Sequence, residues 1–167
     1  MDRRIFLCAR RAGGPQARAA AALLCVTAAL MTSPRPAAAQ FERTPVPVPV
    51  TDVSGSEADS DRAYRPDGAR HLYARYAPHI FKGKLPPLMY AVAITETEID
   101  ENGEVVDAVM LREPAAAKEV APWVLKLIRQ AGPFPKPAKM GRVKYLDIWL
   151  VDKSGRFQLD TLTEGQR

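Results

Sequence analysis

The chain has 167 residues, a formal net charge of +5 at pH 7 and two cysteines. The positive excess lies in residues 1–39, which hold six Lys or Arg and one acid, whereas the remainder holds 18 of each sign. The high pI is therefore no evidence for nucleic-acid binding by the remainder. Both Cys8 and Cys25 also lie before residue 40, which excludes disulfides, thiol catalysis and Cys-ligated metal from the rest of the chain.

The N-terminus has the order of a signal peptide. Arginines come first, an apolar run covers residues 19–31, and "TSPRP" then leads to the small residues at 37–39. The run has about 13 residues, whereas a membrane-spanning helix needs about 20. We therefore expect residues 1–39 to be removed by cleavage between Ala39 and Gln40. An uncleaved anchor is the alternative.

Residues 40–65 are predicted to be a flexible linker. In "TPVPVPV" every second residue is proline, which favours an extended, polyproline-like backbone. The following "TDVSGSEADSDR" is polar and acidic, as is typical of disordered segments. One small folded domain is therefore expected over residues 66–167.

The first half of this domain reads as one helix and one hairpin. In "DGARHLYARYA" apolar residues recur at i,i+4, with Asp67 as N-cap and Pro78 as the stop. "LMYAVAITETEID" alternates and predicts a long strand. The residues at 101–103 predict a tight turn, and "EVVDAVMLRE" is the return strand.

The second half reads as a helix and two strands. An apolar stripe predicts a helix from about Lys118 to Ala131, with Pro122 tolerated in its first turn. "VKYLDIWLVD" and "FQLDTL" predict two strands joined by the turn "KSGR". The order α-β-β-α-β-β predicts an α+β fold, with an antiparallel sheet of three to four strands packed by one main helix and an N-terminal helix.

These motifs resemble the C-terminal domain of the TonB/TolA family of periplasmic energy transducers. The resemblance rests on "IDENGEVVDAVMLREP", the amphipathic helix, "AGPFPKPAKMG" and the alternating strand, and covers about residues 72–151. "LYARYAPHIF" is similar to the TolA branch. The resemblance implies a periplasmic location in a Gram-negative-type envelope. It also implies that the final edge strand binds a partner by strand addition.

The sequence departs from that family in three places. Its leader looks cleavable, its linker is short, and the chain continues past the usual final strand. The predicted function is therefore an exported, non-catalytic binding module for an envelope protein or extended peptide. Two alternatives stay open: a structural, self-associating component such as a homodimer, and an inner-membrane-anchored energy transducer with an uncleaved leader.

The predicted partner-binding residues are those of the last long strand. They are Lys144, Tyr145, Leu146, Asp147, Ile148, Trp149, Leu150 and Val151. Both faces of this strand are largely apolar, and an unprotected edge of this kind invites aggregation. We therefore expect residues 157–162 to pair with residues 144–151 as a cap. A partner would displace the cap or use the edge at residues 105–111.

A second predicted surface is basic. It comprises Lys126, Arg129, Lys136 and Lys139. These side chains either face an acidic partner or the anionic outer-membrane surface, or they are ordinary solvated residues.

Nothing in the sequence predicts catalysis, a metal site or a cofactor. His71 and His79 are separated by a proline, and two histidines alone leave a metal site incomplete. The alternating Glu96, Glu98 and Asp100 are typical of a solvated strand face. Ser154 lies in a turn, and no nucleophile elbow or phosphate loop is present.

Overall fold

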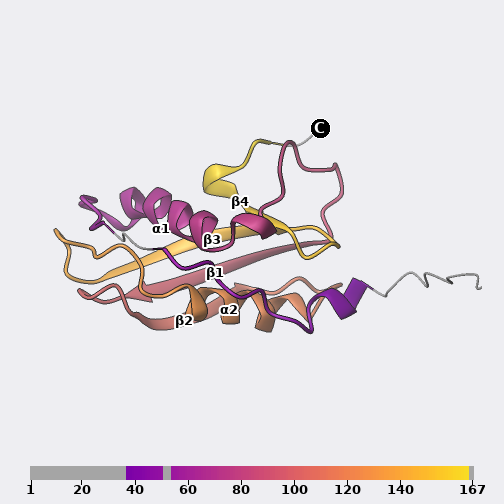
Figure 1. The fold of residues 1–167 in the computed structure, drawn as a ribbon, viewed down its shortest axis with the longest axis horizontal. Helices are drawn as coiled ribbons and strands as arrows, with labels where there is room; N and C mark the ends of the chain where they lie inside the picture. Colours follow the sequence, from indigo (N-terminus) through magenta and orange to yellow (C-terminus); the bar gives the residue numbers. More distant parts are fainter. Residues whose placement is uncertain (1–36, 51–53, 166–167) are drawn as a thin grey trace, which may run out of the picture. The chain divides into compact units, whose positions relative to one another are not determined.

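The four strands of the computed structural model form one antiparallel sheet in the order β2-β1-β3-β4 (Figure 1). The structure describes residues 37–50 and 54–165, so Cys8, Cys25 and most of the expected signal peptide lie outside the described residues. The α+β class and the order α-β-β-α-β-β are confirmed. The elements are α1 (Asp61–Arg75), β1 (Ala91–Ile99), β2 (Val105–Arg112), α2 (Val120–Ala131), β3 (Val143–Val151) and β4 (Phe157–Leu159), with short 3-10 helices η1 (Ala37–Gln40), η2 (Ala77–His79) and η3 (Asp160–Leu162).

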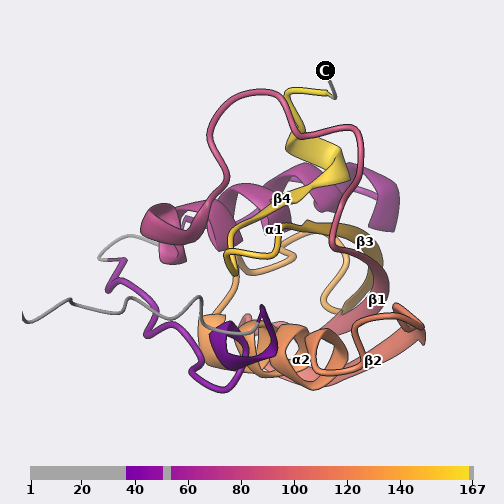
Figure 2. The ribbon, with the colours of Figure 1, turned by 90° about the vertical axis from the view of Figure 1, so that its right-hand side faces the viewer.

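Both long helices pack on one face of the sheet (Figure 2). Alternate residues of β1 and β3 are buried, as the sequence alternation predicts. Tyr64 of α1 packs on Tyr145 of β3, with ring centres 5.2 Å apart. Phe157 contacts both Trp149 of β3 and Trp123 of α2. Within residues 37–50 and 54–165, no helix covers the other face of the sheet.

The predicted hairpin between β1 and β2 is confirmed. Gly103 has a φ of 88°, which glycine adopts without strain. The Asp100 carboxylate accepts hydrogen bonds from the backbone N–H groups of Asn102 and Glu104, at 2.8 and 2.9 Å. Phe134 N–H donates to Gly103 O at 2.7 Å, so the tip is tied to the loop after α2.

Helix α1 begins at Asp61, earlier than the expected start near Pro66, which lies inside the helix. Asp67 is therefore not its N-cap; it accepts hydrogen bonds from Ser56 and Arg70. The extension follows from tertiary packing. Tyr64 is fully buried and its hydroxyl donates to Pro135 O at 2.6 Å, which stabilises a turn that local sequence disfavours.

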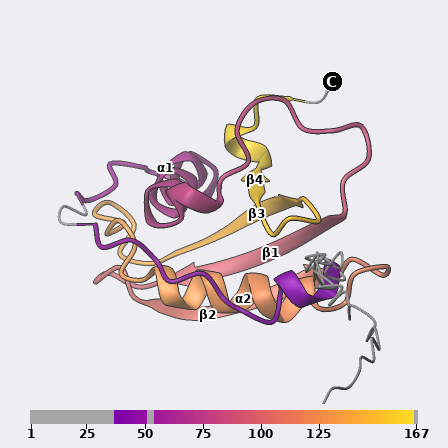
Figure 3. The ribbon, with the colours of Figure 1, turned by 45° about the vertical axis from the view of Figure 1, so that its right-hand side comes forward.

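The described part of the expected linker is attached to the domain, which corrects the prediction that residues 40–65 are flexible. Residues 41–50, the N-terminal strap, run along α2 toward the end of α1 (Figure 3). Phe41 is buried, stacks on Tyr90 at 5.6 Å and meets Trp123 edge-on at 5.1 Å. Val48 N–H donates to Arg75 O at 2.7 Å. The packing of Phe41 thus attaches a segment whose composition is typical of disorder. The proline-rich stretch itself forms no helix or strand, as predicted.

Candidate functional site

Strand β4 covers only the end of β3. The pairs are Trp149 with Leu159, Leu150 with Gln158, and Val151 with Phe157. The expected cap is therefore confirmed for residues 149–151 and wrong for residues 144–148. Within residues 37–50 and 54–165, no strand pairs with the outer side of β3 at residues 144–148.

After the three residues of β4, the chain no longer pairs with β3, because polar contacts hold it in another direction. The Gln158 side-chain amide donates to Phe81 O and Gly83 O, each at 2.8 Å, and accepts from Thr163. Leu159 N–H donates to the Tyr73 hydroxyl at 3.1 Å. These bonds hold the chain toward the 81–83 loop, and η3 follows where further pairing would continue.

The unpaired part of β3 presents backbone groups in a definite order. Asp152 N–H donates to Arg156 O at 2.8 Å, so the N–H of Asp152 faces β4. Backbone groups alternate between the two sides of an antiparallel strand. Lys144, Leu146 and Ile148 therefore present their N–H and C=O groups to the unpaired side. We call residues 144–148 the open edge.

A surface depression of about 480 Å³ lies beside the open edge, under the first turns of α1. Helix α1 lies close to β3 here because residue 68 is a glycine: a Cβ at Gly68 would lie 2.9 Å from the Tyr145 ring. Leu146 is 43 % exposed. The depression is lined by Asp61, Arg62 and Arg65 of α1, Glu96 of β1, and Lys144, Tyr145 and Leu146 of β3.

The acidic row on β1 is engaged in ion pairs across the strands. Lys144 Nζ lies 3.4 Å from Glu96 Oε1 and 3.6 Å from Glu98 Oε2, and Arg142 lies 3.0 Å from Glu98. The Glu96 carboxylate raises the pKa of Lys144. Asp100 serves the hairpin turn instead, where the hydrogen bond from Glu104 N–H lowers its pKa. These acids therefore act as a solvated strand face with cross-strand ion pairs.

Asp147 is the charged residue among those predicted partner-binding residues that are buried on the helix side of the sheet, together with Tyr145, Trp149 and Val151. It is only 2 % exposed, and its Oδ1 accepts a long hydrogen bond from the Thr161 hydroxyl of η3 at 3.5 Å. Its Oδ2 has no hydrogen-bond partner in the described part of the chain. Burial raises the pKa of Asp147 to about 7, although the nearby Arg65 guanidinium lowers it in part.

At the opposite edge of the sheet, side chains cover the outward backbone groups at the centre of β2. Ala108 N–H donates to Asp107 Oδ1 at 2.8 Å, and Ala108 O accepts from Arg129 Nη2 at 2.9 Å. Side chains therefore occupy both backbone groups of Ala108. A segment that added to β2 would have to displace a carboxylate and a guanidinium.

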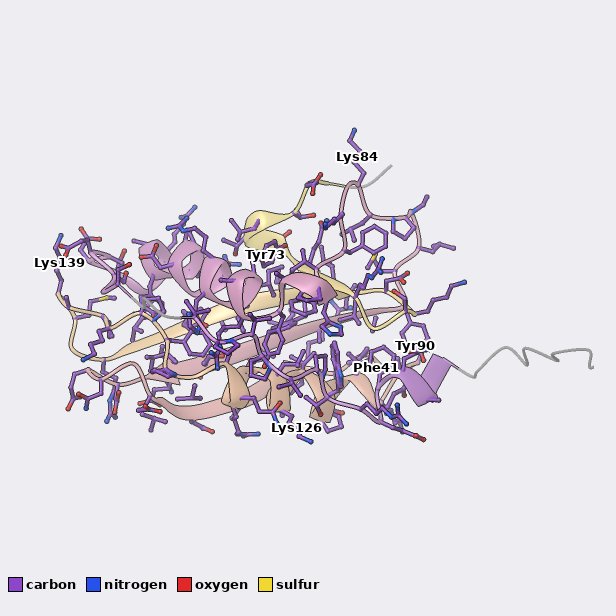
Figure 4. All side chains as sticks on the ribbon, viewed as in Figure 1. Phe41, Tyr73, Lys84, Tyr90, Lys126 and Lys139 are labelled. Atoms are coloured by element: carbon purple, nitrogen blue, oxygen red, sulfur yellow. The ribbon has the colours of Figure 1, made fainter. Side chains whose placement is uncertain are left out.

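The four residues of the predicted basic surface have different surroundings. Arg129 contacts β2, and Lys139 pairs with Glu57 at 3.4 Å. Lys126 is exposed on α2, well away from Lys139 (Figure 4). The exposed Lys136 contributes its backbone carbonyl, which accepts from Ser56 N–H. Two other bases, Arg62 and Arg65, lie beside the open edge; sequence analysis placed them in a linker, and their i,i+3 spacing was the available signal.

Neither histidine lies in a group that resembles a catalytic or metal site. His71 is buried, its Nε2 lies 2.8 Å from Ala131 O, and burial lowers its pKa. His79 lies in η2. Among the residues that the structure describes, no three His, Cys, Asp or Glu side chains gather where they could hold a metal ion.

In the described ranges, the helices are too short or too polar to cross a membrane. Comparisons of the chain with protein-family models, with curated proteins and with solved structures find no match. The resemblance to the TonB/TolA family therefore stays a prediction from the order of its motifs.

Proposed function

We propose that this domain binds an extended segment of an envelope protein by adding it as a strand to the open edge of β3. The observation that carries the proposal is the contrast between the two sheet edges. On the outer side of β3, residues 144–148 have no strand partner in the described part of the chain and lie beside a depression, whereas Ala108 of β2 is covered by side chains. Strand addition requires such an unpaired edge.

The expected affinity is modest. Three residues offer six backbone groups, and each hydrogen bond contributes roughly 1 kcal/mol net. Association itself costs about 4–15 kcal/mol, so backbone pairing alone does not give tight binding. Side chains of the partner must therefore contribute, and the depression under α1 is where they would make contact.

The resemblance to the TonB/TolA family supports the proposal that β3 is the binding edge. It also supports a periplasmic location. In this proposal the leader is cleaved and the domain is not an energy transducer. N-terminal mass in cell fractions tests that part: a chain starting at Gln40 is expected, whereas a chain starting at Met1 would favour the anchored alternative.

Self-association through the same edge is the less favoured reading. Two copies paired by a twofold axis through β3 would bring Arg62 and Arg65 of each copy next to those of the other. Like charges at such an interface oppose binding. Sedimentation of the free protein tests this reading, because a concentration-dependent dimer would support the self-associating alternative.

A synthetic nine-residue peptide that alternates Val with Thr provides the test of strand addition. We expect it to shift the amide signals of Lys144, Leu146 and Ile148 in two-dimensional NMR spectra. Leu146→Pro removes one outward N–H without removing a hydrogen bond to β1, and is expected to weaken binding at least about tenfold. Leu146→Ala keeps that N–H and is the matched control. Shifts confined to β2, or no shifts, would contradict the proposal.

A further inference from the structure

The depression beside the open edge is lined by three bases, Arg62, Arg65 and Lys144, and by two acids, Asp61 and Glu96. Arg62 and Arg65 are three residues apart on α1 and therefore lie side by side. Within residues 37–50 and 54–165, neither forms an ion pair within 4 Å. Arg62 is exposed, and the buried Nε of Arg65 has no hydrogen-bond partner in that part of the chain.

The acids near these arginines only partly offset them. Glu96 lines the same depression but pairs with Lys144. Asp147 of β3 lies near Arg65 but is buried in the protein. Asp61 is the remaining exposed acid at this site, and the N-terminus of α1 adds further positive potential.

Side chains of an added strand would alternate between two surroundings. Those on the helix side of the sheet would enter the depression next to Arg62 and Arg65. Those on the other side would lie beside Leu146 and Ile148, which are apolar and partly exposed. The helix side therefore favours acidic side chains of the added segment, and the other side favours apolar ones.

We infer that the open edge selects extended segments in which acidic and apolar residues alternate, with the acidic side chains directed toward Arg62 and Arg65. This inference rests on the proposed strand addition. It names the class of partner: an amphipathic, acidic β-segment rather than a neutral or basic one.

Three nine-residue peptides test the inference on the full chain. Val alternates with Glu in the first, with Thr in the second and with Lys in the third. At low salt we expect the Glu peptide to bind about three- to tenfold more tightly than the Thr peptide, because two partly exposed ion pairs are gained. The Lys peptide should bind most weakly. Salt at about 0.5 M should reduce the differences.

Charge reversal identifies the residues responsible. The double variant Arg62→Glu, Arg65→Glu is expected to invert the order of the three peptides. Because Arg65 lies beside the buried Asp147, the exposed Arg62→Glu alone serves as a second variant and should reduce the preference about twofold or more. Lys82→Glu with Lys84→Glu makes the same change in net charge on the exposed loop that carries Lys84, away from α1 (Figure 4), and should leave the preference unchanged.

The outcomes separate this inference from the proposed function. If all three peptides shift the amides of the open edge with equal affinity, strand addition stands and the charge selection is wrong. If the Glu preference survives in both arginine variants, the depression is not its cause and the inference is also wrong. If no peptide binds at residues 144–148, the proposed function and the inference both fail.

Discussion

The two edges of this sheet are treated differently by the side chains around them. At β2, Asp107 and Arg129 occupy both backbone groups of Ala108. At β3, residues 144–148 have no such cover within the described part of the chain. Proteins commonly protect exposed edges against unwanted pairing. Under the proposed function, the open edge is the place where a partner strand is added.

The largest expected effect concerns residues 149–151 of β3, where β4 covers the edge. Phe157 is fully buried against Trp149, with ring centres 4.8 Å apart, and also contacts Trp123 and Tyr76. Phe157→Ala should lower the free energy of unfolding by about 3–5 kcal/mol, measured by urea denaturation. This would show that β4 is a permanent part of the core. A cost below about 1 kcal/mol would mean that a partner can displace β4, and that the difference between residues 149–151 and 144–148 is small.

The second effect depends on pH and concerns the point where β3 loses its β4 partner. Asp147 has a pKa of about 7 in the folded protein, well above the ordinary 3.8 of an aspartate, because burial disfavours its charged form. At this carboxyl the folded state thus binds more protons than the unfolded state, so the contribution of Asp147 to stability is most favourable below about pH 4 and falls as pH rises to about 7. The difference of about three units corresponds to roughly 4 kcal/mol.

Asp147→Asn tests this reasoning. The groups that face Asp147 are Arg65 and Tyr73 of α1, Tyr145 of β3 and Asp160 of η3. The asparagine variant should lose less stability than the wild type between pH 5 and pH 8, as measured by urea midpoints. Equal losses in both proteins would show that Asp147 is solvated or paired in solution.

Much of the fold is predictable from local pattern, whereas the state of each edge is not. Alternation along β1 and β3, and the turn at Gly103, are local signals. The start of α1 depends on Tyr64 packing on Tyr145, about 80 residues away in sequence. The strap likewise depends on Phe41 finding Tyr90 and Trp123.

The same distinction applies to the candidate site. The strand at residues 143–151 is predicted by its alternation and is present in the structure. What opens its edge is the set of hydrogen bonds from Gln158 to the 81–83 loop, and what closes β2 is Arg129 on another element. Neither contact leaves a periodic signal in the sequence.

A smaller effect should follow from removing the cover of β2. Asp107→Ala with Arg129→Gln exposes both backbone groups of Ala108, and each lost hydrogen bond costs roughly 0.5–1.5 kcal/mol. We expect this variant to self-associate or to bind a second peptide, which sedimentation and titration stoichiometry would detect. Lys126→Gln, on the outer face of the same helix, is the control. An unchanged monomer with a single binding site would mean that Ala108 is not the reason that β2 is closed.

The smallest expected effect concerns the ion pairs on the helix-free face. Lys144 bridges Glu96 and Glu98, but all three side chains are partly or largely exposed. Such pairs contribute little to stability. Lys144→Met should therefore leave the urea midpoint almost unchanged and should preserve peptide binding at the edge. A loss of binding would show that Lys144 contacts the partner directly, beyond its backbone groups.

Amide hydrogen exchange of the free protein tests the open edge most directly. Leu146 and Leu150 belong to the same strand and direct their N–H groups to the same side, but only Leu150 lies opposite a β4 residue, Gln158. We predict that the amides of Lys144, Leu146 and Ile148 exchange at least about a hundredfold faster than that of Leu150. Equal protection of Leu146 and Leu150 would show that residues 144–148 are already paired, and would contradict the account.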